Sequence, residues 1–147
     1  MIKSSSKEYI LVFIIIFLFG CNPNSPNEEN NKNILSDDEI NNILIEIEQD
    51  INSRLPRKLK YTTWESVIAG NKEITYKYRI HAFNPIEIEK NKDMFKKELF
   101  VDIKNGSCTD PSTRDLLKLG VRNIYVYHDI NNQYLFEFYI DKTICKS

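Results

Sequence analysis

Residues 74–82 alternate between apolar and polar side chains, and this pattern restricts the fold more than any other part of the sequence. The apolar positions are Ile74, Tyr76, Tyr78, Ile80 and Ala82. A period of two is typical of a β-strand with one buried side and one side in water. Residues 61–69 are rich in strand-forming side chains, and the residues 69–72 that follow have turn chemistry. The sequence therefore predicts a β-hairpin whose apolar side needs cover from other elements.

A second hairpin is predicted near the C-terminus. Residues 121–128 and 133–141 are expected to be strands joined through residues 129–132, and Phe136, Phe138 and Ile140 again alternate with more polar positions. Two hairpins can join into one four-stranded antiparallel sheet. We therefore expect the second hairpin to extend the sheet that the first one begins.

Three segments have the features of helices. Ser36 and Glu39 have the spacing of a capping box, and the apolar residues that follow, at helical spacing up to about Ser53, are Ile40, Ile43, Leu44, Ile47 and Ile51. A second helix is expected from about Ile88 to Lys104, ended by Asn105-Gly106. A third should begin at Asp110-Pro111 and end at Gly120. The order α-β-β-α-α-β-β predicts a two-layer α+β domain over residues 34–147, with two or three helices on one face of the sheet.

The first 21 residues have the features of an export signal. Lys3 and Lys7 precede the apolar run Ile10–Phe19, which is shorter than the 20 or so residues that a membrane-spanning helix needs. The run ends in Leu18-Phe19-Gly20-Cys21, which resembles the lipobox of bacterial lipoproteins. In that family the cysteine thiol takes a diacylglycerol and the freed amine is usually acylated, for example with palmitate. The resemblance implies that residues 1–20 are a signal peptide and that Cys21 is the lipidated N-terminus of the mature protein.

The alternatives are an ordinary signal peptide with an incidental cysteine, or an uncleaved anchor. Asn22 stands where an Asp tends to retain Gram-negative lipoproteins in the inner membrane, so the resemblance implies the outer membrane in such a host. Residues 22–33 contain no apolar side chain to bury, so we expect a disordered tether. A flexible chain of that length reaches roughly 20 Å on average.

Cys108 and Cys145 remain once Cys21 is assigned to lipid. Two cysteines in an exported domain predict a disulfide, which for a loop of this length contributes roughly 3.5–4 kcal/mol in the chain-entropy model. The alternatives are two free thiols or part of a metal site. His81 and His128 have no close spacing to either cysteine, so no metal ligands are assigned.

Composition and motifs argue against several classes of function. The formal net charge of -1 argues against nucleic-acid binding. The basic stretch Arg54–Lys60 is the local exception, and it is either a solvated connector or a patch for anions or lipid headgroups. The sequence shows no Ser-His-Asp set, no Cys-His set, no glycine-rich phosphate loop and no HExxH motif. We therefore expect no enzymatic activity and no cofactor.

Aromatic residues make up 12% of the chain and concentrate on the predicted strands. Tyr and Trp are enriched where proteins contact each other, so Tyr61, Trp64, Tyr125 and Tyr127 are candidate binding residues. The alternative is that these rings form the core, with their hydroxyl groups at its edge.

A second resemblance covers most of the predicted domain. The segments that carry it are Leu55-Pro56, Ile74–Tyr78, Arg114–Leu117, Gly120 and Tyr125–Tyr127, together with Cys108 and Cys145. They are similar to small exported bacterial proteins without a characterised activity, and the similarity supports the fold and the disulfide alone.

Our leading hypothesis is a lipid-anchored envelope protein that binds another envelope protein as an accessory or assembly factor. Pilot proteins, inhibitors of secreted enzymes and exclusion lipoproteins share this outline. A periplasmic carrier of small ligands is the alternative, and it requires an apolar cavity.

Overall fold

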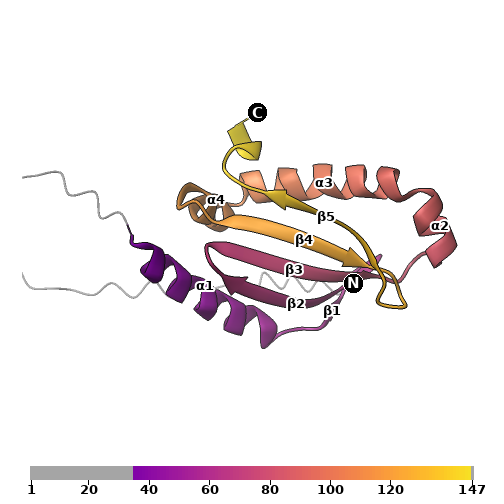
Figure 1. The fold of residues 1–147 in the computed structure, drawn as a ribbon, viewed down its shortest axis with the longest axis horizontal. Coiled ribbons are helices and arrows are strands. Elements are labelled where there is room, and N and C mark those ends of the chain that lie inside the picture. The colour runs from indigo at the N-terminus through magenta and orange to yellow at the C-terminus, as the bar shows by residue number, and fades with distance from the viewer. Residues whose placement is uncertain (1–34, 147) are drawn as a thin grey trace, which may run out of the picture. The chain divides into compact units, whose positions relative to one another are not determined.

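The computed structural model describes residues 35–146, which form a five-stranded sheet and several helices (Figure 1). The elements in chain order are α1 (Asp37–Asn52), β1 (Arg57–Lys58), β2 (Thr62–Gly70), β3 (Glu73–Ile80), α2 (Pro85–Lys90), α3 (Lys92–Thr109), α4 (Pro111–Lys118), β4 (Arg122–His128), β5 (Tyr134–Ile140) and the short 3-10 helix η1 (Ile144–Lys146). The predicted α+β class is confirmed. The predicted signal peptide, Cys21 and the tether lie outside the described residues. Within residues 35–146, no helix is both long and apolar enough to cross a membrane.

The strand order in the sheet is β1-β2-β3-β4-β5, so neighbours in the chain are neighbours in space. The predicted four-stranded antiparallel sheet is wrong in two respects. A fifth strand, β1, pairs with β2 at Arg57 and Lys58, and β3 pairs with β4 in parallel, from Glu73 opposite Arg122 to Arg79 opposite His128. The parallel pairing is possible because α2, α3 and α4 carry the chain back to the end where β3 begins.

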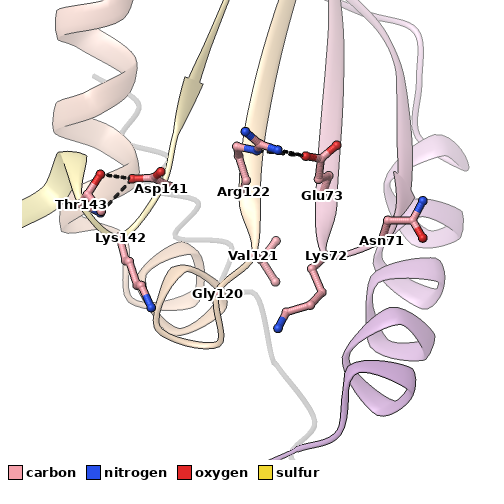
Figure 2. A pocket seen from close by; sticks show the side chains of 9 residues that line it. All are labelled: Asn71, Lys72, Glu73, Gly120, Val121, Arg122, Asp141, Lys142 and Thr143. Carbon is pink, nitrogen blue, oxygen red and sulfur yellow. Dashed lines mark hydrogen bonds and ion pairs between the residues drawn. The ribbon is translucent and has the colours of Figure 1, made fainter.

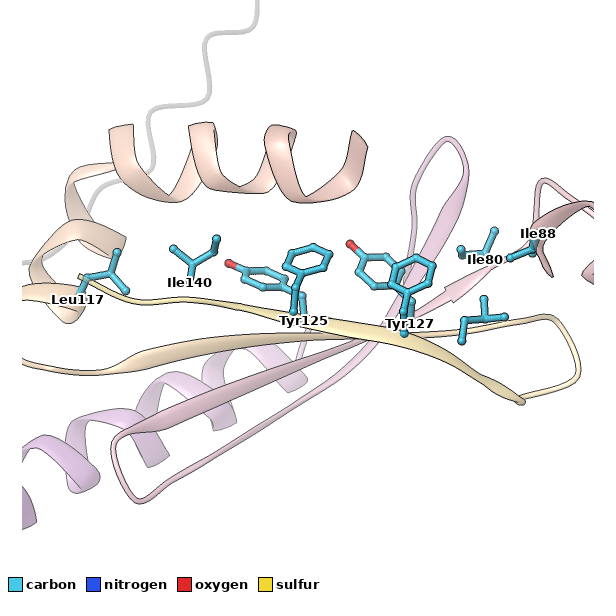
Figure 3. Close-up of a cluster of buried hydrophobic side chains, with 9 residues drawn as sticks. Ile80, Ile88, Leu117, Tyr125, Tyr127 and Ile140 are labelled. Atoms are coloured by element: carbon cyan, nitrogen blue, oxygen red, sulfur yellow. The ribbon is translucent and has the colours of Figure 1, made fainter. Parts of the chain in front are cut away.

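Helix α1 lies along β2 and α3 along β5 (Figure 1), and the side chains they cover belong to the same face of the sheet. The cluster with α1 includes Val67 and Ile74, and the cluster under α3 includes Tyr125 and Ile140. The registers of the paired strands place the side chains of both clusters on the same face of the sheet. Figure 3 shows Tyr125, Tyr127 and Ile140 standing on the side of the sheet that faces α3. The structure is therefore two-layered, and the second face of the sheet carries no helix of the described residues.

Two helix boundaries differ from the predictions. Asn84 and Glu87 form a capping box that begins α2, with Pro85 in its first turn, where the sequence predicted only a break after β3. Helix α3 runs through Gly106 to Thr109 instead of ending at Asn105. Ser107 is buried, with its hydroxyl 3.1 Å from that of Tyr125, and Cys108 is bonded to Cys145. These tertiary contacts hold the last turn of α3 despite the low helix propensity of glycine.

The disulfide between Cys108 and Cys145 joins the end of α3 to η1, with the two Cα atoms 5.3 Å apart. The C-terminal segment is therefore tied to the helical layer after β5 leaves the sheet. Cross-linking also restricts the unfolded chain, which is the main source of the stabilisation by such a bridge.

Leu44 tests the packing of α1, because its side chain is fully buried while the adjacent Ile45 is 43% exposed. We expect Leu44→Ala to lower the free energy of unfolding by about 2–5 kcal/mol, since it leaves a cavity between α1 and the sheet. Ile45→Ala is the matched control and should change it by roughly 0.5 kcal/mol or less. Urea denaturation of both variants measures the difference, and equal losses would contradict the packing described for α1.

The buried phenols of Tyr76, Tyr78, Tyr125 and Tyr127 should make the fold sensitive to alkali. Burial raises the pKa of each phenol, because it takes the charged form out of water. In the unfolded chain these groups lose their protons at about pH 10, the ordinary pKa of a tyrosine phenol. Stability should therefore be complete below that pH and fall as the pH rises through and above it.

Absorbance at 295 nm and circular dichroism, followed together from pH 8 to 12.5, check this expectation. We expect the four phenols to ionise together with loss of the fold. Ionisation of all tyrosines near pH 10 with the fold intact would contradict it.

Candidate functional site

Three half-buried rings on the helix-bearing face form the candidate binding surface, which we call the aromatic strip. It consists of Trp64 on β2 and Tyr76 and Tyr78 on β3. The Trp64 ring lies 5.9 Å from the Tyr76 ring and 6.0 Å from the Tyr78 ring, measured between centroids. On the far side, Tyr76 stacks on Tyr125 at 5.0 Å and Tyr78 on Tyr127 at 5.2 Å. The strip is thus the accessible edge of an aromatic layer that crosses the sheet.

The register of β2 places Trp64 in this layer. Trp64 pairs with Tyr78 and Val67 pairs with Tyr76, with an irregularity between Trp64 and Ser66 that adds one residue to β2. A bulge of this kind lets two residues oppose one on the partner strand. Without it, Trp64 and Val67 would point to opposite faces, because they are an odd number of positions apart.

The strip stays partly open because the two long helices cover the sheet on either side of it. Helix α1 packs on β2 and on the start of β3, while α3 packs on β5 (Figure 1). The helices turn further half-buried apolar side chains toward the same face: Ile47 and Ile51 from α1, and Phe95, Leu99 and Ile103 from α3. The floor and flanks of this surface are therefore apolar.

The strip carries no formal charge at neutral pH. Loss of hydration is the largest cause of the raised pKa of Tyr76 and of Tyr78, so both phenols keep their protons. The indole Nε1 of Trp64 is buried and has no acceptor among the described residues. Packing alone positions the Trp64 ring, and one hydrogen-bond donor in the strip is unused. Such a surface suits neutral, apolar segments.

The four aromatic candidates from the sequence have different positions. Tyr61 is 50% exposed, and its ring lies 6.1 Å from that of Phe83, which is not part of the strip. Trp64 is part of the strip. Tyr125 and Tyr127 are only 7% and 2% exposed, so they support the strip from the core and do not offer a surface.

Sequence reasoning did not select Tyr76 and Tyr78, although the alternation of residues 74–82 places them on the buried side. Tyr76 and Tyr78 are accessible to a partner only because α1 and α3 leave this part of the sheet uncovered. Nothing in the local pattern shows which part of the apolar face the helices leave open.

The opposite face of the sheet is polar, and its charges are largely paired. Arg79 lies 2.5 Å from Glu65, and Arg122 binds Glu73 while its guanidinium lies 5.5 Å from the centre of the Tyr139 ring. Exposed pairs of this kind add little stability. They do neutralise this face, which gives no strong field for a charged ligand.

The basic stretch Arg54–Lys60 contains the edge strand β1. Arg54 pairs with Asp50, and the Lys60 ammonium lies 4.6 Å from the centre of the Tyr61 ring. Cations on an edge strand discourage pairing with another chain. The position of these cations on an edge strand accounts for the positive charge of the stretch, and no bound anion is needed to explain it.

The described residues do not assemble an evident reaction centre. Among residues 35–146, no group of three or more His, Cys, Asp or Glu side chains could hold a metal ion. His81 Nδ1 is 3.3 Å from Thr63 Oγ1, and the His128 ring packs against Tyr134 at 6.2 Å. Cys108 and Cys145 are bonded to each other.

Comparison with known proteins finds similar folds and no sequence family. No family model matches the chain, and no curated protein matches it. A pilotin of the type 2 secretion system of Vibrio vulnificus is 10% identical, with a TM-score of 0.63 over 76% of this chain and 96% of that chain. The type II secretion system pilotin of Vibrio cholerae is also 10% identical, with a TM-score of 0.58 over 74% and 94% of the two chains.

A protein from Pseudomonas aeruginosa that is described as secreted is 17% identical, with a TM-score of 0.61 over 74% of this chain and 95% of that chain. At these identities the comparisons show the fold alone. Nearly the whole of each of these small bacterial proteins shares its fold with the present chain.

Proposed function

We propose that this chain is a lipid-anchored accessory or assembly factor of the cell envelope that binds another envelope protein through the aromatic strip. The strip carries the proposal, because half-buried Trp and Tyr rings with apolar flanks are typical of surfaces that bind protein segments. The occupant would be an apolar polypeptide segment.

The fold comparisons support this class of function. Two of the similar folds belong to pilotins of type 2 secretion systems. A role as an accessory to an envelope assembly therefore fits both the fold and the surface. The chain would act by binding and not as an enzyme, consistent with the absence of a catalytic set from the sequence motifs.

The lipid anchor completes the proposal. The lipobox resemblance at Leu18–Cys21 supports attachment through Cys21, with Asn22 favouring the outer membrane of a Gram-negative host. Stable attachment generally needs more than one acyl chain, and a triacylated cysteine meets that condition. The binding domain would then remain at the membrane where its partner is assembled.

Mass spectrometry of the protein purified from a Gram-negative host tests the anchor. We expect an N-terminal peptide that begins at an acylated Cys21 and a protein that fractionates with the outer membrane. Asn22→Asp should move the protein toward the inner membrane, while Cys21→Ala should leave it unacylated. An intact Met1, or a new N-terminus without acyl chains, would contradict the anchor.

Substitutions of two accessible aromatic residues test the binding surface. We expect the pair Tyr61→Ser and Trp64→Leu to reduce capture of the partner from detergent-solubilised envelopes at least 10-fold, because it removes two aromatic contacts. Tyr139→Ser is the matched control, since Tyr139 is 48% exposed on the opposite face. Quantitative mass spectrometry of the captured proteins measures the loss.

Thermal denaturation of each variant separates lost binding from lost folding. A specific partner that the strip variant and the Tyr139 control retain equally would place the contact elsewhere. Recovery of no specific partner by the unaltered protein would count against the proposed class of function.

A further inference from the structure

A hollow beside the disulfide is lined by cations and, among residues 35–146, by no acidic side chain. Its volume is about 320 Å³, and its lining residues are Cys108, Arg114, Leu117, Lys118, Lys142, Cys145 and Lys146. The disulfide and Leu117 provide an apolar floor, while four positive groups from α4 and the C-terminal segment surround it. No local pattern in the sequence indicates these four cations as a group, because only the fold and the disulfide bring α4 close to the C-terminal segment. We call it the basic hollow.

The nearby acids leave the basic hollow with an excess of positive charge. Lys118 Nζ lies 2.7 Å from Asp115 Oδ1, an exposed pair. The hydrogen bond from Lys118 is the main reason that the pKa of Asp115 is lowered, and the charge of Arg114 adds to it. Asp110 and Asp141 accept backbone N–H groups of Thr113 and Thr143 at 2.8 Å. Among the described residues, Lys142 and Lys146 have no ion-pair partner.

The basic hollow adjoins a second hollow, of about 410 Å³, which shares Lys142 and is lined by Lys72, Gly120 and Arg122 and also by the acids Glu73 and Asp141, so that its charge is mixed. Figure 2 shows Lys72 and Lys142 extending toward the same end of the sheet, on either side of Gly120. A Cβ atom on Gly120 would lie 3.6 Å from the Lys72 ammonium, and Gly120 has a φ of +86°. The 3.6 Å distance is an ordinary contact, so the positive φ is what favours glycine at this position.

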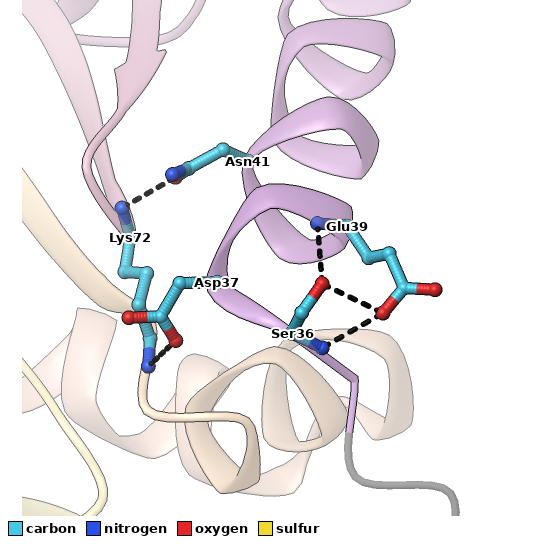
Figure 4. Close-up of polar contacts among 5 residues, drawn as sticks. All are labelled: Ser36, Asp37, Glu39, Asn41 and Lys72. Carbon is cyan, nitrogen blue, oxygen red and sulfur yellow. Dashed lines mark hydrogen bonds and ion pairs between the residues drawn. The ribbon is translucent and has the colours of Figure 1, made fainter.

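The same end of the domain is where α1 begins. Lys72 Nζ lies 2.9 Å from Asp37 Oδ1, and the Lys72 backbone N–H donates to Asn41 Oδ1 at 2.8 Å (Figure 4). Ser36 and Glu39 close the capping box that fixes this first turn. The covalent link to residues 1–34 is therefore made beside Lys72. The acids of this turn line neither hollow.

Attachment through Cys21 would hold this end near the bilayer. Residues 22–34 span at most about 45 Å when fully extended, and a flexible chain of that length reaches roughly 20 Å on average. The cations of the basic hollow would then meet anionic headgroups often as the anchored domain moves on its tether. Arg114 can bind two phosphate oxygens with its planar guanidinium, while the lysines act as point charges.

We propose that the basic hollow binds the phosphate of anionic phospholipid headgroups, so that the anchor and the hollow together orient the domain on the membrane. The inference rests on the lipid anchor of the proposed function. The Cys108–Cys145 bridge is part of the site, because it holds the lysines of the C-terminal segment beside α4. The aromatic strip, between the helices farther along the sheet, stays accessible to a partner in this orientation.

Lysine reactivity in lipid nanodiscs tests the orientation. The lipidated mature protein is placed in discs of phosphatidylcholine alone or of phosphatidylcholine with 30% phosphatidylglycerol, a composition of roughly the anionic content needed for surface binding. Each lysine is then acetylated for a short time and quantified by mass spectrometry. We expect Lys118, Lys142 and Lys146 to react at least about 3-fold more slowly in the anionic discs, and high salt to remove the difference.

Lys96 and Lys97, exposed on α3, are the matched internal controls and should react equally in both discs. The variant Lys142→Gln with Lys146→Gln should lose the protection of Lys118, whereas Lys96→Gln with Lys97→Gln should retain it. Inorganic phosphate added to the neutral discs tests the other source of the same chemistry. Equal protection by phosphate would assign the hollow to a free anion and overturn the lipid proposal.

The two failures are distinguishable. Equal reactivity of the three lysines in both discs, with the protein incorporated, contradicts the basic hollow alone. A chain that enters neither disc contradicts the anchor, and the proposed orientation falls with it.

Discussion

The parallel pairing of β3 with β4 is the interaction on which the rest of this structure depends. It joins a hairpin covered by α1 to a hairpin covered by α3 and α4, and no other strand pair connects the two halves of the described sheet. The pairing aligns Tyr76 with Tyr125 and Tyr78 with Tyr127, so that their rings stack at 5.0 and 5.2 Å. A shift by one residue would send each ring to the opposite face and separate the two cores. The aromatic layer therefore stabilises the register as well as the surface it exposes.

The parallel pairing also decides where the functional regions lie. It requires a long helical crossover, which returns the chain to the end of the sheet where β3 begins and where α1 also starts. The C-terminal segment leaves β5 at this same end and is bonded to the last turn of α3. The start of the described domain, the cations and the disulfide are thus gathered at one end, while the aromatic strip occupies the middle of the sheet.

Local features of the sequence predicted most elements but not their assembly. The capping box of α1, both hairpins and the Cys108–Cys145 bridge were found because neighbouring residues or compartment chemistry carry their signals. Helix α2 was missed although Asn84 and Glu87 have the same capping spacing as Ser36 and Glu39. The parallel pairing, the strand β1 and the passage of α3 through Gly106 depend on contacts between distant segments, which no local pattern contains.

The same distinction explains why the binding residues were only partly predicted. The four candidates were all aromatic residues on predicted strands. In the structure Tyr125 and Tyr127 on β4 are buried, whereas Tyr61, just before β2, and Trp64 stay accessible. Coverage by a helix, and not residue type, separates core rings from surface rings. The proposed contact with a partner at the aromatic strip and the proposed contact with lipid at the basic hollow would also use different parts of this small domain. Contacts at the uncharged strip would depend mainly on apolar burial, and contacts at the basic hollow on charge, which salt screens. A lipid-anchored protein of this form could therefore hold its membrane and its partner at once, because neither interaction competes for the residues of the other.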